Sequence, residues 1–482
     1  DRVDAHTLLS EKNIYVMPHA PPDLKPVAGI ATVSEGNLVS HVQLLSRNLG
    51  IPNAILSEAD LNLLKAYSGQ TVFYAVSPGG TVIMKPSAAM TVEEKNLVET
   101  RRRSDERIAV PLDRIDLTPV APIPLSRLKA SDSGRWCGPK AANLGQLKHD
   151  FPEHVVDGFV IPFGAFRQHM DEAMPGTGSS YWHFLQQTFD AGDGESSGQD
   201  DRDAIILARL SDLREAIGRM AFSPAFETAV RDGFRFHLGA DMGTLPVFVR
   251  SDTNMEDLKD FTGAGLNLTV FNVRDEARIF QAIREVWASA YTERSYHWRH
   301  RFLTNPENIY PSILVIPTVD VAKSGVMITT GVTGGHPDDI TVAFSRGAGG
   351  AVEGQIAETW RLTPDDRVLL LSPARDPFFT VLPKSGGVSK AITSFETPLL
   401  DEAELDQLRR MAATVKRRLA ENSEIGSSGP WDIELGFRDG RIWLFQIRPF
   451  VEHKQARTSA YLNQIDRAVP ENRNIPLGWI LP

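Results

Sequence analysis

The stretch Trp431-Asp-Ile-Glu-Leu-Gly-Phe-Arg-Asp-Gly-Arg-Ile-Trp-Leu-Phe-Gln-Ile-Arg-Pro449 contains two apolar segments with interspersed polar residues. The sequence Arg438-Asp-Gly-Arg441 between them is typical of a hairpin turn, because Asp-Gly favours the backbone conformation that such turns require. The two segments are therefore predicted to be neighbouring antiparallel strands.

Four polar side chains are the candidates for chemistry in this hairpin. The two-residue period of a strand places Asp432 and Glu434 on one face, and Gln446 and Arg448 likewise share a face. Glu434 and Gln446 can then present oxygens to one Mg²⁺, a cation that prefers oxygen ligands and phosphates, with Arg448 beside the same triphosphate. The alternative is a polar outer face of the hairpin with no ligand.

A second apolar strand ends at an arginine. In Val247-Phe-Val-Arg-Ser-Asp-Thr-Asn-Met-Glu-Asp257, Arg250 offers a guanidinium group for phosphate oxygens. Gly263-Ala-Gly265 follows, and its small residues allow close approach of a ligand to the backbone. The alternative is that Arg250 pairs with Asp252 or Glu256 to hold the loop.

Lys140 lies in Gly138-Pro-Lys-Ala-Ala-Asn-Leu-Gly145, between a turn and a predicted helix. A lysine there can reach a nucleotide phosphate as a point charge. The alternative is an ordinary surface lysine. The segment is not a P-loop, because the glycine frame that ends in Gly-Lys-Ser/Thr is absent.

His41 lies in the stretch from Ser34 to Leu56, in the first turn of a predicted short helix. Free backbone N–H groups at a helix start favour an anion, and a neutral imidazole is a usable nucleophile near pH 7. Predicted short strands surround this helix, and Gly79-Gly80 indicates a hairpin. The alternative for His41 is a capping or packing role.

The composition limits the class of protein. The 482 residues carry a net charge of −10, which argues against a broad nucleic-acid surface. One cysteine, Cys137, excludes an intrachain disulfide and favours a reducing, cytoplasmic location. There is no apolar run long enough for a membrane span and no visible signal peptide. Because the sequence opens with Asp1 and lacks an initiator Met, a further upstream domain is expected.

The pattern of strands, charges and prolines divides the chain into four parts. We expect a small α/β module at 1–85, a linker with a charged helix at 86–125, a large domain at 126–455 and a C-terminal tail at 456–482 that packs back on the body. The fold class is therefore α/β and α+β, with several domains.

Five blocks of the large domain occur in a familiar order. They are Gly138-Pro-Lys-Ala-Ala-Asn-Leu144, Val249-Arg-Ser-Asp-Thr-Asn-Met-Glu-Asp-Leu258, Ser324-Gly-Val-Met327, Asp432-Ile-Glu434 and Gln446-Ile-Arg-Pro449. The domain resembles the two-lobed ATP-grasp nucleotide-binding domain of the dikinase family, which includes phosphoenolpyruvate synthase, pyruvate phosphate dikinase, rifampin phosphotransferase and the α-glucan water dikinases. Residues 1–85 resemble the family's β/β/α swivelling phosphohistidine domain, through Ser40-His41 and Leu49-Gly-Ile-Pro52.

The resemblance implies a role for eight residues. ATP would be bound by Lys140, Arg250, Gly265, Thr269, Glu434, Gln446 and Arg448, with Glu434 and Gln446 also as Mg²⁺ ligands. His41 would accept the β-phosphoryl group of ATP, while the γ-phosphate goes to water or phosphate and AMP is left. Phospho-His41 would then pass the group to an unknown acceptor, a carbohydrate or small molecule, and the linker would let His41 move between sites.

Four departures from the family pattern bear on activity. Pro139 replaces a glycine, Ile316 occupies the usual position of a glutamine near the adenine, and Gly350 stands where a glutamate commonly lies. Asp252 also replaces a serine. The departures at Ile316 and Gly350 motivate an alternative, an ATP-binding regulatory module that has lost turnover.

The order of the two domains suggests an acceptor. The histidine domain comes first here, as in the glucan water dikinases, which suggests a glucan acceptor bound by a domain outside this chain. Another alternative is a phosphoenolpyruvate synthase-like enzyme with a separate acceptor domain.

Overall fold

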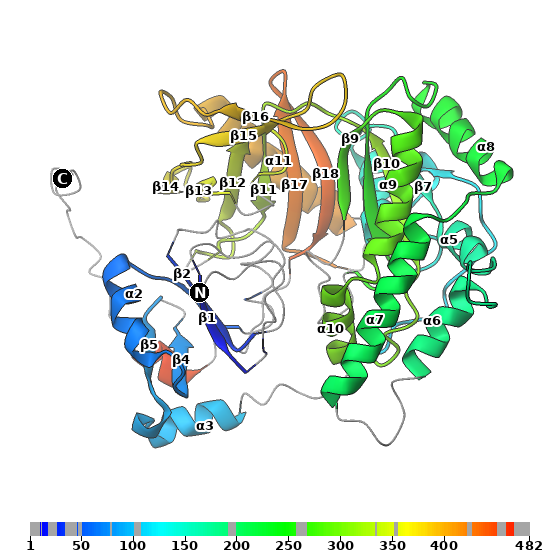
Figure 1. Cartoon of the computed structure of the whole chain (residues 1–482). Coiled ribbons are helices and arrows are strands. Elements are labelled where there is room, and N and C mark those ends of the chain that lie inside the picture. Colours follow the sequence, from blue (N-terminus) through cyan, green and yellow to red (C-terminus); the bar gives the residue numbers. More distant parts are fainter. Residues whose placement is uncertain are drawn as a thin grey trace.

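The computed structural model describes most of the large domain and parts of the N-terminal module. The described residues are 10, 12–17, 27–33, 46, 51–77, 80–100, 108–190, 199–256, 268–332, 335–350, 355–421, 427–450 and 459–466. They form a mixed α/β protein with several separate sheets (Figure 1), as predicted for a multidomain chain. His41, Gly265 and the tail beyond residue 466 lie outside the described residues.

The N-terminal module contains a small parallel sheet and a hairpin. The sheet is formed by β1 (Ile14–Met17), β2 (Gly29–Thr32) and β3 (Asn53–Ile55), and the hairpin by β4 (Val72–Val76) and β5 (Val82–Pro86). Helix α2 (Glu58–Leu64) begins at Ser57, whose side chain accepts from the Asp60 amide. The Tyr74 hydroxyl donates to the Ile30 carbonyl over 2.7 Å, and this bond joins the hairpin to the sheet.

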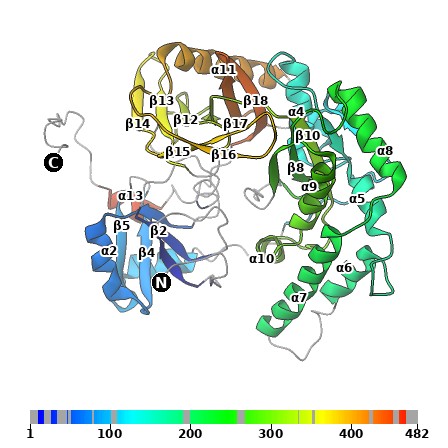
Figure 2. The same ribbon diagram turned by 45° about the horizontal axis from the view of Figure 1, so that its top comes forward.

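Two helices distant in sequence cover this module. They are α3 (Val92–Thr100), from the predicted linker, and α13 (Ala460–Gln464), from the C-terminal part of the chain. Leu462 is fully buried against Phe73 and Ala75 of β4, so α13 belongs to the core of the module. Figure 2 shows α13 beside β5. The described part of the predicted tail thus packs on the N-terminal module, and not on the large domain.

The first sheet of the large domain has five antiparallel strands in the order β6-β7-β10-β8-β9. The strands are β6 (Ile123–Pro124), β7 (Phe159–Ile161), β8 (Val247–Thr253), β9 (Thr269–Val273) and β10 (Pro311–Pro317). The helices around this sheet are α4 (Pro139–Asp150), α5 (Phe163–Met170), α6 (Tyr181–Asp190), α7 (Gln199–Gly218), α8 (Pro224–Gly233), α9 (Glu276–Ser289) and α10 (Glu293–Phe302).

The second sheet has six antiparallel strands in the order β14-β13-β12-β11-β17-β18. The strands are β11 (Lys323–Ile328), β12 (Ile340–Arg346), β13 (Glu358–Leu362), β14 (Val368–Ser372), β17 (Trp431–Arg438) and β18 (Arg441–Pro449). Helix α11 (Glu402–Glu421) packs against it, and β15 (Phe378–Val381) pairs with β16 (Ser389–Ile392) nearby.

Strand β8 directs alternate side chains into two different hydrophobic cores of the large domain. Val247 and Val249 point into the core below α5 to α9, whereas Phe248 points into the core shared with α4, α11 and the second sheet. Arg250 and Asp252 continue the face of Phe248. The strand therefore directs these two polar side chains towards α4 and β18.

The predicted linker, 86–125, makes contacts at both of its ends. Met90 and Leu97 pack against the N-terminal module, while Val110 and Leu117 belong to or pack on the first core of the large domain. None of the helices within the described ranges combines the length and apolar character needed to cross a bilayer.

Candidate functional site

The β17–β18 hairpin forms as the sequence predicts. Glu434 lies opposite Gln446 and Asp432 lies opposite Arg448 in the antiparallel register. Asp439 and Gly440, in the turn, both have positive φ values of 52° and 72°, which is why Asp-Gly suits this position. The hairpin thus brings two predicted metal-ligand residues side by side.

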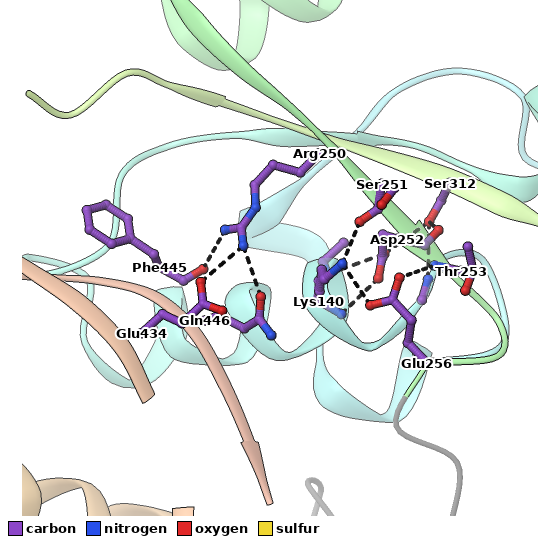
Figure 3. A network of polar contacts seen from close by, with 12 residues as sticks. Lys140, Arg250, Ser251, Asp252, Thr253, Glu256, Ser312, Glu434, Phe445 and Gln446 are labelled. Atoms are coloured by element: carbon purple, nitrogen blue, oxygen red, sulfur yellow. Dashed lines mark hydrogen bonds and ion pairs between the residues drawn. The ribbon is translucent and has the colours of Figure 1, made fainter. Parts of the chain in front are cut away.

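Arg250 reaches across from β8 to this hairpin. Its Nη2 donates to Gln446 Oε1 over 2.9 Å and to Glu434 Oε2 over 3.2 Å, and its Nη1 donates to the Phe445 carbonyl over 3.2 Å (Figure 3). These side chains are largely buried, with only 15% of the Glu434 side chain exposed. The alternative of a solvated outer face is therefore wrong for this part of the hairpin.

Lys140 lies in the first turn of α4, and its side chain contacts the end of β8 and the turn that follows. Its Nζ donates to the Ser251 carbonyl over 3.0 Å and pairs with Glu256 Oε2 at 2.9 Å. The side chain is 15% exposed, so the alternative of a surface lysine is also wrong. Figure 3 shows the Lys140 and Arg250 networks next to each other along β8.

The structure gives Asp252 contacts that the sequence did not predict, at the start of helix α4. The Asp252 side chain is completely buried and accepts from the backbone amides of Lys140 (2.8 Å) and Ala141 (3.3 Å). Ser312 on β10 lies 3.0 Å from Oδ2. Burial raises the pKa of this carboxyl to about 6, although Lys140 acts in the opposite direction. The alternative that Arg250 pairs with Asp252 or Glu256 does not match these contacts, because Arg250 pairs with Glu434 and Glu256 pairs with Lys140. The signal for Asp252 in the sequence was its position two residues after Arg250, on the same face of the strand.

Arg448 forms a separate buried pair at the end of the hairpin. Its Nε and Nη2 each lie 2.8 Å from Asp432 Oδ2. The Asp432–Arg448 pair lies two residues along the hairpin from the Glu434–Gln446 pair, and a carboxylate opposes the charge of Arg448. Thr269 is the register partner of Arg250 on the neighbouring strand β9.

The oxygens available to a metal ion are few. The described residues include no group of three or more His, Cys, Asp or Glu side chains arranged for a metal. Glu434 and Gln446 supply two converging oxygens. This set fits Mg²⁺ only where a bound phosphate or water completes the coordination, which is how proteins commonly hold this ion.

The structure shows the surroundings of two residues that depart from the family pattern, Ile316 and Gly350. Ile316 is fully buried in the core between the two sheets, so its side chain is not available to a base. At Gly350, an added Cβ would lie 2.0 Å from Gln355 Oε1 and 2.5 Å from Ser345 Oγ, so a larger side chain would require these neighbours to move. Glu353, the carboxylate nearest to Gly350 in the sequence, lies outside the described residues.

Comparison with known proteins adds an independent observation to this geometry. Residues 135–468 match the model of the AMP/ATP-binding domain of pyruvate phosphate dikinase. The chain belongs to this dikinase family. Every predicted nucleotide-site residue lies inside the matched range, whereas His41 lies outside it.

Several curated proteins are similar to about two thirds of the chain. A phosphoenolpyruvate synthase from Aeropyrum pernix is 26% identical over 381 residues, covering 71% of this chain and 43% of the relative. An uncharacterized phosphotransferase from Bacillus subtilis is 24% identical over 340 residues, covering 69% and 35%. A rifampicin phosphotransferase from a Streptomyces species is 24% identical over 314 residues, covering 65% and 34%. The chain thus spans less than half the length of each.

Proposed function

We propose that the chain is a dikinase-type, ATP-dependent phosphotransferase that works through phospho-His41. A nitrogen of His41 attacks the β-phosphorus of ATP, and the bond from that phosphorus to the α–β bridging oxygen breaks, releasing AMP. The γ-phosphoryl group is transferred to water or phosphate. The phosphoryl group on His41 then passes to an acceptor.

The observation that carries this proposal is the convergence of Lys140, Arg250, Glu434 and Gln446 from three separate parts of the chain. Two cations suit phosphate oxygens, and two side-chain oxygens suit a hard metal ion. The cluster lies between two antiparallel sheets inside the matched ATP-binding domain. This arrangement supports an ATP-grasp domain over residues 126–455, with Thr269, Gly265 and Arg448 as further ATP contacts.

The position of Mg²⁺ follows from a shared contact. Glu434 Oε2 and Gln446 Oε1 both lie within hydrogen-bonding distance of one atom, Arg250 Nη2, so both can reach a single cation. When bound there, Mg²⁺ would neutralise charge on the phosphates. Arg250 occupies the space between these oxygens in the present structure. Nucleotide binding therefore requires its guanidinium to turn from Glu434 towards the phosphates.

The N-terminal module is proposed as the phosphohistidine carrier. Residues 1–85 carry His41, and the contacts of α3 and α13 extend the module in sequence at both ends. Movement of this unit would bring His41 to the nucleotide and then to the acceptor.

The relatives suggest which acceptors of the phosphoryl group should be tested first. Phosphoenolpyruvate synthases among them make pyruvate one compound to test, and the rifampicin phosphotransferase makes a small hydroxylated molecule another. The glucan suggested by domain order has no counterpart among these relatives.

The test is AMP formation from Mg-ATP, measured by chromatography with and without pyruvate. We expect AMP from the wild type and a large loss in Lys140→Ala. Pyruvate-dependent AMP formation would favour the synthase-like alternative.

A second candidate function is an ATP-binding regulatory module without turnover. Two positions favour this candidate, because neither supplies the polar side chain that the family pattern expects near the nucleotide. Ile316 is fully buried, and a larger side chain at Gly350 would require its neighbours to move. This candidate predicts ATP binding with no AMP. AMP above background contradicts this candidate, and tight ATP binding without AMP contradicts the first.

A further inference from the structure

We propose that Asp252 is a positioning residue that caps helix α4 from a neighbouring strand and thereby fixes Lys140 for contact with the nucleotide phosphates. The proposal rests on the proposed function, in that Lys140 is taken to contact phosphate. It also gives a common reason for two departures from the family pattern, Pro139 and Asp252.

Helix α4 has no cap of its own. Its N-cap residue is Gly138, which has no side chain, and Pro139 at the first helical position has no N–H. The next two amides, of Lys140 and Ala141, are directed at the Asp252 carboxylate. A carboxylate at a helix start satisfies these free donors and opposes the positive end of the helix dipole. Asp252 thus supplies, from 112 residues away, the cap that α4 lacks.

The carboxylate is itself held from a third segment. Ser312 Oγ on β10 lies 3.0 Å from Asp252 Oδ2 and 2.9 Å from the Asp252 carbonyl, and it accepts from the Gly138 amide over 3.2 Å. A Cβ added at Gly138 would lie 2.4 Å from Asp252 Oδ1. The turn before α4 is therefore locked against the end of β8, and only glycine fits at position 138.

These contacts determine where the Lys140 ammonium group lies. The Lys140 backbone is fixed by Asp252, while its Nζ contacts the Ser251 carbonyl on the same strand and Glu256 in the turn that follows the strand. Because Asp252 already occupies the amides of Lys140 and Ala141, those amides cannot bind a phosphate. Recognition of phosphate by this segment then depends on the Lys140 side chain alone, unlike the backbone cradle of a P-loop.

A double-mutant cycle separates positioning from general structural support. ATP affinity would be measured by calorimetry, and the KM and kcat for AMP formation by chromatography, for Asp252→Ala, Lys140→Ala and the double variant. We expect Asp252→Ala to weaken ATP binding about 10-fold or more, as for loss of hydrogen bonds to a charged group. We expect it to add little further in the Lys140→Ala background. Asp252→Asn, which keeps one acceptor for the Lys140 amide, should restore part of the affinity.

Glu358 offers a matched control. It is a buried carboxylate that also accepts from two backbone amides, those of Leu399 and Leu400, but it lies on β13 outside the site. Glu358→Gln should lower the melting temperature and leave the ATP affinity of the folded protein unchanged.

The outcomes distinguish this inference from the proposed function. If Lys140→Ala binds ATP as well as the wild type, the assigned role of Lys140 fails. If Lys140→Ala weakens binding but folded Asp252→Ala and Asp252→Asn do not, the positioning role of Asp252 is wrong. Equal losses from Asp252→Ala with and without Lys140 would also contradict it. If Asp252→Ala does not fold, the same comparison with Asp252→Asn decides.

Discussion

Glu434 and Gln446 face each other across β17 and β18, and both direct an oxygen at the same nitrogen of Arg250. A cation thus already lies where the proposed nucleotide site needs positive charge. In the structure this cation is a guanidinium group. We expect Mg²⁺ and phosphate to share its place once ATP is bound.

Arg250→Ala should strongly impair turnover. The variant removes the guanidinium proposed to contact phosphate, and donors of this kind commonly contribute about 100-fold or more to a rate. Arg250→Lys should recover little, because an ammonium cannot reproduce the forked geometry. AMP formation measures both. Arg278→Ala is the control, because it breaks an arginine–glutamate pair with Glu285 away from the site. Equal activity of Arg250→Ala and the control would contradict the assigned role.

Glu434→Gln should raise the Mg²⁺ concentration needed for half-maximal AMP formation by about 10-fold or more. The change keeps the shape of the side chain but removes the charge that a hard cation prefers. Titration of Mg²⁺ at saturating ATP measures the effect, with Glu285→Gln as the surface control. An unchanged Mg²⁺ requirement would exclude Glu434 as a ligand.

The burial of Asp252 predicts a pH-dependent stability difference. Its pKa of about 6 in the folded state exceeds the ordinary aspartate value of 3.8. The folded state therefore binds this proton more tightly, and the stabilising contribution is present below pH 3.8 and lost as pH rises through about 6. A pKa difference of about 2 between the folded and unfolded states corresponds to about 3 kcal/mol in the free energy of unfolding.

Urea denaturation of the wild type and Asp252→Asn tests this. The stability of the wild type relative to the variant should fall by up to about 3 kcal/mol between about pH 4 and pH 7. The main charged group facing Asp252 is Lys140, while burial keeps the pKa of the nearby Cys137 thiol well above its usual value. A constant difference across this range would show that Asp252 has an ordinary pKa.

Leu462→Ala should loosen the N-terminal module. Leu462 is fully buried against Phe73 and Ala75, and truncation of such a side chain costs about 2 kcal/mol or more. Tyr461 also donates a hydrogen bond to Glu94, which pairs with Lys85 at 2.7 Å. Hydrogen exchange of the β4 and β5 amides should speed up in the variant.

Gln464→Ala changes an exposed position on the same helix and should leave this exchange unchanged. Equal exchange in both variants would mean that α13 does not stabilise the module.

The sequence was sufficient to predict elements whose patterns are local. The Asp-Gly turn and the two-residue period predicted the β17–β18 pair, and the helical spacing after Gly138 predicted α4. The contact between Asp252 and Lys140 could not be foreseen, because it joins residues 112 positions apart through the pairing of separate strands. The packing of α13 on the N-terminal module was missed because a five-residue helix with one buried leucine has no distinctive periodicity.

The most direct test of the central claim is transfer of label from β-³²P-ATP to the protein. The account predicts an acid-labile label on the wild type, lost in His41→Ala and strongly reduced in Lys140→Ala and Arg250→Ala. The His41→Ala variant should still bind ATP, because His41 lies outside the matched nucleotide-binding domain. Label that persists in His41→Ala would contradict the assignment of His41 as the phosphoryl carrier.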